Sequence, residues 1–332
     1  MKMLRMVLWL AGMGLLIGLT MNQGFSEMKS AFAEVGWGVF LICAVAVVFL
    51  CVGTRSWHAL LAADTRPKYK TLLWCRWIST SINALLPVAQ IGGDIVRARL
   101  IALRGVPGAE AGASVVADVT IGVLIQVLFA GMGLLLLIGR EGLSATSVIA
   151  IFTVVVFGLI VVVFYVAQHT GLFRRMSRVF VRVAGMQNGE NLIGNAQDID
   201  QALVMIYRRR PAILRACGWR LASWYVGVIE VWIALWFLQC PVSLVEAMIL
   251  ESLGQAVRKA AFIIPGGLGA QEGGFMVLGI GMGLGPDIGL ALSLVKRVRE
   301  LMIGIPAFMA WKVVRSRTGE MTVGSSPHRL SI

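Results

Sequence analysis

Between Ser114 and Ile138 the chain reads SVVADVTIGVLIQVLFAGMGLLLLI, in which Asp118 is the only charged residue. This stretch is longer than the ~20 apolar residues that an α-helix needs to cross a bilayer. Similar apolar stretches lie at Met6–Met21, Gly38–Val52, Ser147–Ala167, Ile213–Leu238 and Leu290–Val314. The sequence therefore predicts an all-α, polytopic helical membrane protein with about six full spans.

The composition of the whole chain agrees with this prediction. Only 14% of the residues are charged and 58% are hydrophobic, whereas a soluble domain carries about 25% charged residues. The net charge is +13, and the basic residues fall between the apolar stretches, which favours anionic lipid headgroups over nucleic acid as partners. The five cysteines and three histidines are scattered, so we expect neither a metal nor any other cofactor.

Lysine and arginine residues concentrate in alternate connections between the predicted spans. The basic connections are 55–76, 169–210 and the segment after the last span, whereas 22–36, 139–146 and 239–243 carry at most one basic residue each. The positive-inside rule then predicts that both termini are cytoplasmic. Residues 173–183 fit either a basic amphipathic helix on the inner leaflet or an ordinary basic loop. We predict one transmembrane domain over residues 1–316 and a polar cytoplasmic tail over 317–332.

The N-terminus admits two interpretations. Lys2 and Arg5 precede the first apolar stretch, and Ala31-Phe32-Ala33 resembles the small-residue site at which a signal peptide is cleaved. Because the apolar stretch is long and this site lies well beyond it, we favour an uncleaved first helix.

Two segments combine apolar residues with proline, glycine pairs and charge. The first, residues 79–97, reads STSINALLPVAQIGGDIVR, and basic residues flank it on both sides. A segment with basic ends on the same side is expected to enter the membrane and return. Pro87 and the Gly92-Gly93 pair would break its helix at depth, which is tolerated where protein or a water-filled cavity satisfies the backbone.

The second broken segment, residues 257–274, reads VRKAAFIIPGGLGAQEGG and follows a predicted span that ends outside. Glu272 lies seven positions after Pro265, as Asp94 lies seven positions after Pro87. The two segments are therefore predicted to be re-entrant helical hairpins that form an inverted repeat, an arrangement found in transporters. The alternative is that both are simple Gly-Pro hinge loops.

Several charged residues lie within apolar surroundings, where a charge costs about 2.5 kcal/mol or more by insertion scales. Asp118 and Glu230 lie inside predicted spans, and Lys296, Arg297, Arg299 and Glu300 lie in the last one. These charges line either a polar site or structural ion pairs. The candidate substrate-binding residues are Asn83, Pro87, Gly92, Gly93, Asp94, Arg97, Glu251, Arg258, Pro265, Gly266, Gly267, Glu272 and Arg297. Most tryptophans, Trp57 among them, are predicted to be interfacial anchors.

These motifs carry a family resemblance. N-x-LLP-x4-GGD-x2-R at 83–97 and PGGLG-x2-E at 265–272 resemble the paired signatures of the flippase-like transmembrane family, which is related to the membrane part of lysylphosphatidylglycerol synthases. ESLGQAVR at 251–258 and ALSLVKRVREL at 291–301 are similar to the hopanoid-biosynthesis-associated subgroup. Because no soluble aminoacyl-transfer domain follows the membrane region, we do not expect synthase activity. The sequence also has no Asp-x-x-Asp motif or histidine cluster, so we do not expect the protein to be an enzyme.

The resemblance implies lipid translocation or export at the bacterial inner membrane, through a polar site between the two broken helices, and the resemblance to the subgroup names hopanoid lipids as candidate substrates. The expected partners are a membrane lipid substrate with an anionic headgroup and lipid-biosynthesis enzymes, without nucleic acid. Two alternatives stay open, namely a non-catalytic membrane scaffold for lipid-synthesis enzymes and a membrane-embedded lipid transferase.

Overall fold

The structure is a computed structural model that describes residues 35–85, 92–169, 190–261 and 269–323. Its helices are α3 (Gly38–Leu60), α4 (Tyr69–Leu85), α5 (Gly92–Ala102), α6 (Gly108–Glu141), α7 (Ala145–His169), α9 (Glu190–Arg208), α10 (Arg210–Phe237), α11 (Leu244–Ala260), α12 (Ala270–Gly281) and α13 (Pro286–Val323). The described residues contain no β-strand. This confirms the prediction of an all-α, polytopic helical membrane protein.

Four helices in the described part of the chain are long and apolar enough to cross a membrane, namely α3, α6, α7 and α10. They correspond to four of the predicted spans. The predicted span Met6–Met21 lies outside the described residues. The predicted span Leu290–Val314 lies within α13, where Lys296, Arg297, Arg299 and Glu300 lower the apolar character. The same helix runs on to Val323, beyond the domain boundary predicted at residue 316.

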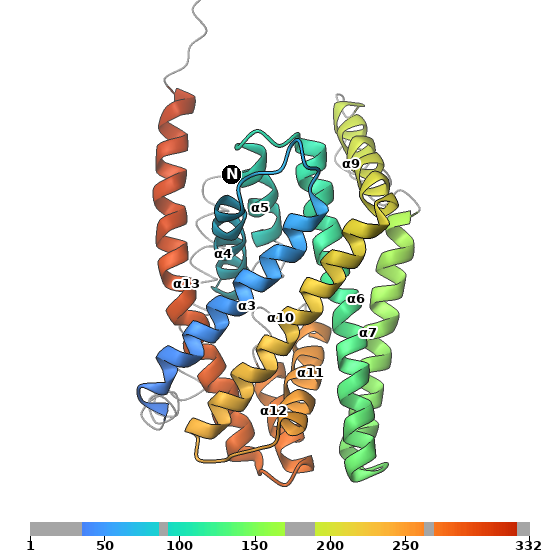
Figure 1. The fold of residues 1–332 in the computed structure, drawn as a ribbon, viewed down its shortest axis with the longest axis vertical. Helices are drawn as coiled ribbons and strands as arrows, with labels where there is room; N and C mark the ends of the chain where they lie inside the picture. The colour runs from blue at the N-terminus through green and yellow to red at the C-terminus, as the bar shows by residue number, and fades with distance from the viewer. Residues whose placement is uncertain (1–34, 86–91, 170–189, 262–268, 324–332) are drawn as a thin grey trace, which may run out of the picture.

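The centre of the molecule is a long contact between α3 and α10, which cross the bundle side by side (Figure 1). Aromatic side chains fill the space where α10 also meets α6, and the rings of Phe129 and Trp224 stack with centroids 5.8 Å apart. By contrast α7 lies at the edge and exposes apolar side chains such as Phe152 and Val155. Such a face suits contact with lipid chains.

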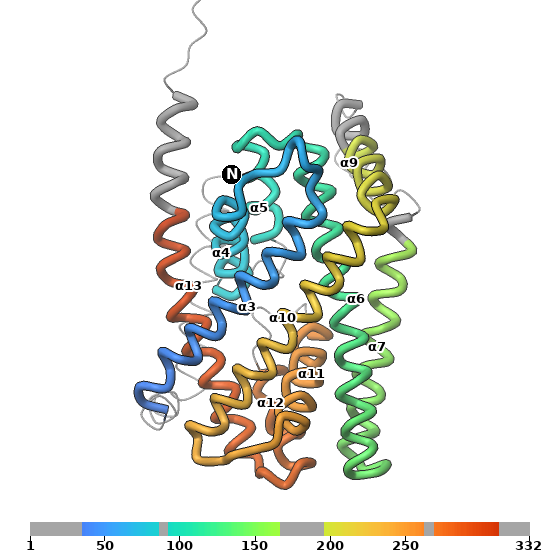
Figure 2. Tube along the Cα trace, viewed as in Figure 1, coloured from blue at the N-terminus to red at the C-terminus, as the bar shows by residue number. Residues whose placement is uncertain are grey.

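The two broken segments form pairs of helices at opposite ends of the bundle. Helices α4 and α5 pack together in the upper half of the view, and α11 and α12 pack together in the lower half (Figures 1 and 2). Pro87 lies between α4 and α5, and Pro265, Gly266 and Gly267 lie between α11 and α12, all outside the described residues.

Close packing within each pair depends on glycine. A Cβ atom added to Gly93 would lie 2.1 Å from the carbonyl oxygen of Ser79, so α5 approaches α4 more closely than any side chain permits. In the second pair, a Cβ atom added to Gly254 would lie 2.6 Å from the ring of Phe275. Small residues of this kind allow membrane helices to approach closely.

Candidate functional site

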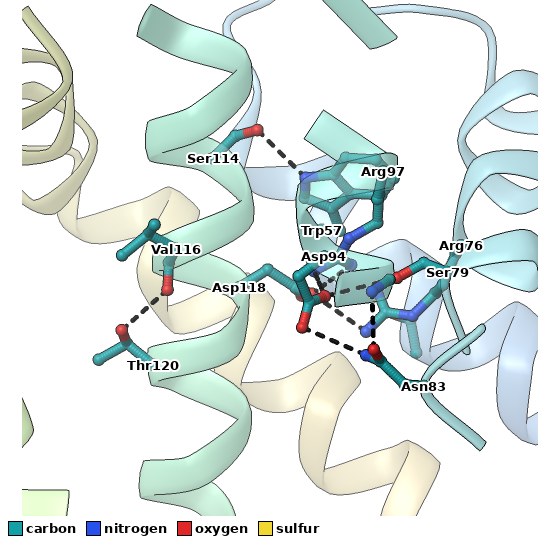
Figure 3. A network of polar contacts seen from close by, with 12 residues as sticks. Trp57, Arg76, Ser79, Asn83, Asp94, Arg97, Ser114, Val116, Asp118 and Thr120 are labelled. Atoms are coloured by element: carbon teal, nitrogen blue, oxygen red, sulfur yellow. Dashed lines mark hydrogen bonds and ion pairs between the residues drawn. The ribbon is translucent and has the colours of Figure 1, made fainter. Parts of the chain in front are cut away.

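A buried aspartate organises the first cluster of charges. Asp118 of α6 accepts hydrogen bonds from Arg97 of α5 at 2.8 Å and from Arg76 of α4 at 3.0 Å. Arg220 of α10 donates to the other carboxylate oxygen. Together with Asp94 these residues are called the first network, and Figure 3 shows Arg76, Asp94, Arg97 and Asp118. The side chain of Asp118 is 1% exposed, so the three guanidinium groups replace the water that this carboxylate would otherwise bind.

Asp94 of α5 forms polar contacts with α4. It pairs with Arg97 at 2.9 Å and lies within hydrogen-bond distance of Ser79 and Asn83 of α4, at 3.5 Å and 3.4 Å. The amide oxygen of Asn83 accepts from the backbone N–H of Gly93 at 2.7 Å. Asp94 lies in the first turn of α5, where a negative charge complements the helix dipole. Its side chain is 23% exposed, which makes it the most accessible member of the first network.

Neighbouring residues hold two arginines of the first network, Arg97 and Arg76, in position. Arg97 lies over the ring of Trp57 at 4.6 Å from the centroid, and the Trp57 indole donates to Ser114 (Figure 3). Trp57 is fully buried, so the prediction that it is an interfacial anchor is wrong. It instead stabilises a cation inside the protein. The backbone carbonyl of Gly53 accepts from Arg76 at 2.9 Å.

The first network carries an unbalanced charge. Three arginines face two aspartates, which leaves one positive charge in excess within a largely buried cluster. Burying charges costs several kcal/mol per ion before the mutual attraction of the partners is counted. Such a cluster therefore has an electrostatic preference for a further anion.

The second cluster of charges, called the second network, joins α10, α11, α12 and α13. Its members are Glu230, Glu251, Arg258, Glu272, Lys296, Arg297, Arg299 and Glu300. Four basic side chains face four carboxylates, so this network is balanced in charge.

Lys296 lies at the buried end of the second network. Its ammonium group lies 2.6 Å from Glu251 and 3.7 Å from Glu230, and its side chain is 2% exposed. Gln255 also donates to Glu251 at 3.1 Å. Arg299 lies 3.4 Å from the other oxygen of Glu230. The acidic residue inside the α10 span is therefore neutralised by two basic residues of α13.

Glu272 occupies the position in the second pair of helices that Asp94 occupies in the first. It lies in the first turn of α12, accepts from the backbone N–H of Gly269 at 2.7 Å and pairs with Arg297 at 3.0 Å. Glu300 then connects Arg297 at 3.4 Å with Arg299 at 3.6 Å. Arg258 also donates to Glu300, so α11, α12 and α13 are joined by one chain of ion pairs.

Lys259 lies in the last turn of α11, directly after Arg258 of the second network. It adds a further basic residue to this end of α11.

The structure divides the predicted site residues between the two networks. Asn83, Gly93, Asp94 and Arg97 belong to the surroundings of the first, and Glu251, Arg258, Glu272 and Arg297 belong to the second. Gly92 begins α5. The remaining four, Pro87, Pro265, Gly266 and Gly267, lie outside the described residues.

Two arginines of the first network are absent from the predicted site. Arg76 was assigned to a basic cytoplasmic connection, but it lies in α4 and its side chain is 10% exposed. Arg220 lies within the predicted span Ile213–Leu238, and a basic residue inside an apolar span is itself a signal of a functional or paired charge. That signal could have identified Arg220 from the sequence.

Comparisons with known proteins identify a family for this chain. A search of curated proteins and a search of solved structures each gave no match. The family model described as the lysylphosphatidylglycerol synthase TM region matches residues 6–307. This match covers all the described helices up to and including most of α13. The chain therefore belongs to the family of the lysylphosphatidylglycerol synthase transmembrane region.

Proposed function

We propose that this protein moves a membrane lipid across or out of the bacterial inner membrane, and that both termini lie in the cytoplasm. The observation that carries the proposal is that each of the two broken pairs of helices contributes to a buried ionic network. Charged residues at bilayer depth are costly and are most often associated with a transport pathway. Membership of a family of lipid-related membrane regions supports a lipid as the substrate.

The charges in this region favour a lipid with an anionic headgroup. The first network has one positive charge in excess. Arginine binds phosphate and carboxylate groups in a bidentate manner. Asp94 and Glu272 occupy the positive N-terminal ends of α5 and α12. An anionic headgroup offers the same chemistry as these carboxylates and can displace them in turn as it passes.

The packing of the helices supports the inverted repeat that the sequence suggests. The offset of 178 positions that relates Asp94 to Glu272 also relates Asp118 to Lys296, the buried centres of the two networks. Helix α4 packs on α13 and, correspondingly, α11 packs on α6. The α4–α5 pair and the α11–α12 pair lie at opposite ends of the bundle (Figure 1). Inverted repeats of this kind bring a substrate site to their interface in transporters.

Two sequence stretches bear on which lipid is the substrate. The resemblance of 251–258 and 291–301 to hopanoid-associated membrane proteins favours hopanoid lipids. The ionic networks serve passage of the headgroup in this account, so the protein is proposed to act as a translocator rather than as an enzyme.

Reconstitution into liposomes tests the proposal. The wild-type protein is expected to accelerate transbilayer movement of a fluorescent anionic lipid, and Arg258→Ala is expected to reduce the rate towards that of protein-free liposomes. Arg99→Ala is the matched control, because Arg99 is exposed on α5 and belongs to neither network. Equal rates for wild-type protein and protein-free liposomes would refute the proposal, and so would equal rates for wild-type and Arg258→Ala protein.

A further inference from the structure

A second site lies on the face of α11 and α12 that is turned away from the ionic networks. A cavity of about 210 Å³ opens between α7, α11 and α12. Its lining includes Ala150 and Thr153 of α7, Val257 of α11, and Gly273 of α12. An apolar cavity of ~150 Å³ already holds a benzene molecule in an engineered protein, so this one has room for a segment of hydrocarbon.

The lining of this cavity is apolar, although it includes Thr146 and Thr153. The hydroxyl of Thr153 donates to the backbone oxygen of Ile149 at 2.9 Å, so it already has a partner within α7. Water needs two to four polar partners to occupy such a space. The remaining lining comes from aliphatic side chains, two glycines and Thr146, so hydrocarbon is the fitting occupant.

The rim of the cavity faces the bilayer. Ile149 of α7 and Val277 of α12 both line the cavity and are 52% and 36% exposed. Helix α7 is one of the candidate spans, with 22% of its apolar window buried. A chain of a membrane lipid can therefore enter from the side without crossing a polar region.

In both α11 and α12, residues that line the cavity are sequence neighbours of members of the second network. Val257 immediately precedes Arg258, and Gly273 immediately follows Glu272. One side of the α11–α12 pair thus carries ion pairs to α13, and the other side carries the apolar cavity. A lipid held here would have its chain beside the same hairpin that is proposed to receive headgroups.

We infer that this cavity is a binding site for one straight acyl chain of a membrane phospholipid. The small volume suits a single chain rather than a fused-ring body. The inference does not depend on the identity of the transported lipid, because it concerns a phospholipid of the surrounding bilayer. It rests on the proposed function only in that the protein handles lipids.

A larger side chain at Gly273 is one way to fill the cavity. A Cβ atom added at Gly273 meets no other atom within 4 Å, whereas one added at Gly274 would lie 2.9 Å from Val257. Gly273→Leu therefore places a side chain in open space within α12. Gly131→Leu is the matched control, because a Cβ atom at Gly131 also meets nothing within 4 Å and Gly131 does not line the cavity. Val277→Trp, on the rim, is a second blocking variant.

Photo-crosslinking measures occupancy of the site. The full-length protein is reconstituted in liposomes of phosphatidylethanolamine and phosphatidylglycerol that contain a trace of phosphatidylcholine with a diazirine on one acyl chain. Labelling is expected at Ala150, which is 6% exposed, and at Val257, as well as at the outward-facing Val155. Gly273→Leu and Val277→Trp are each expected to lower labelling of Ala150 and Val257, relative to Val155, by at least about fivefold, since the cavity is then filled or closed. Gly131→Leu should not change this ratio.

Three results would overturn the inference. The first is labelling of Val155 without labelling of Ala150 and Val257. The second is a labelling ratio that neither blocking variant changes. The third is displacement of the probe by an unlabelled fused-ring triterpenoid but not by unlabelled diacyl lipid. The predicted labelling pattern without lipid movement in the transport assay would uphold this site and refute the proposed function. Lipid movement without the labelling pattern would uphold the proposed function and refute this site.

Discussion

The Nη1 atom of Arg97 lies 2.8 Å from the Oδ2 atom of Asp118, and the two side chains are 3% and 1% exposed. This ion pair joins the short helix α5 to the long span α6. Because Arg97 also binds Asp94, the pair connects the closed end of the first hairpin with the centre of the bundle. The stability of the fold and the placement of the proposed headgroup site therefore depend on the same few atoms.

Asp118→Asn should destabilise the protein strongly. The substitution keeps the shape of the side chain but leaves Arg76, Arg97 and Arg220 with little negative charge to balance them. Removing one partner of a buried ion pair costs about 3–5 kcal/mol. We expect a clear fall in the midpoint of thermal unfolding in detergent, measured by size-exclusion chromatography after heating. Asp64→Asn, at an exposed position before α4, should leave the midpoint unchanged. Equal midpoints for the two variants would contradict this account of Asp118.

Glu251 and Lys296 should behave as a coupled pair. Each of Glu251→Gln and Lys296→Met leaves one buried charge with weaker compensation, whereas the double variant removes both charges. Neighbouring residues of this kind show interaction energies of about 0.5–3 kcal/mol in double-mutant cycles. We expect the double variant to be less destabilised than the sum of the two single variants, as measured by unfolding in detergent. Strict additivity would show that the 2.6 Å contact is not an energetic pairing.

Gly93→Ala should open the first hairpin. The added methyl group would lie 2.1 Å from the carbonyl oxygen of Ser79, and backbone atoms cannot give way as a flexible side chain can. We expect reduced thermal stability and loss of lipid movement in liposomes. Gly108→Ala is the control, because a Cβ atom there meets nothing within 4 Å. Wild-type behaviour of Gly93→Ala would mean that α4 and α5 are not packed as described.

The stability contributed by the capped start of α11 should fall at acidic pH. Ser243 and Glu246 form a capping box, and Glu246 also accepts from Arg140 at the end of α6. This bond from Arg140, together with the bonds from Ser243, lowers the pKa of Glu246 below its ordinary value of 4.5. A lowered pKa gives stability that is present above the unfolded-state value and is lost as the pH falls through the folded-state value.

Glu246→Gln should remove this acid dependence. We expect the variant to be less stable than wild type at neutral pH, and the difference to shrink as the pH falls below about 4.5. Ser243→Ala should cost about 1 kcal/mol through loss of the cap. Thermal unfolding across a pH series checks both outcomes. A difference between Glu246→Gln and wild type that grows on acidification would contradict the assignment.

The sequence was sufficient to predict the fold class and four spans, because long apolar stretches report directly on the bilayer. It also predicted that the helix around residue 87 and the helix around residue 265 would each be divided in two, as α4 and α5 and α11 and α12 are. The prediction that Gly92-Gly93 helps to break the first helix is wrong, because both glycines lie in α5. The helix boundaries were less accurate. Helix α3 continues from the predicted end at Val52 to Leu60, where polar residues such as Thr54 and Ser56 are buried by other helices.

Sequence patterns could not identify the partners of the buried charges. Asp118 pairs with arginines from three other helices, and this choice depends on tertiary packing rather than on spacing along the chain. Arg76 resembled a topology signal because it ends a basic stretch. Trp57 resembled an interfacial anchor for a similar reason, although α6 and α5 bury it. Charge and aromatic character are local properties, whereas burial is decided by the whole bundle.

The central claim is that the two hairpins enter the bilayer from opposite faces. Cysteines at Lys70 and Arg104, near the open end of the first hairpin, and at Leu244 and Asp287, near the open end of the second, test it in a protein whose native cysteines are replaced. All four positions are exposed. Labelling with a membrane-impermeant thiol reagent should reach Lys70→Cys and Arg104→Cys only from the cytoplasmic face, and Leu244→Cys and Asp287→Cys only from the other. Labelling of either pair from two different faces, or of all four positions from one face, would contradict the account.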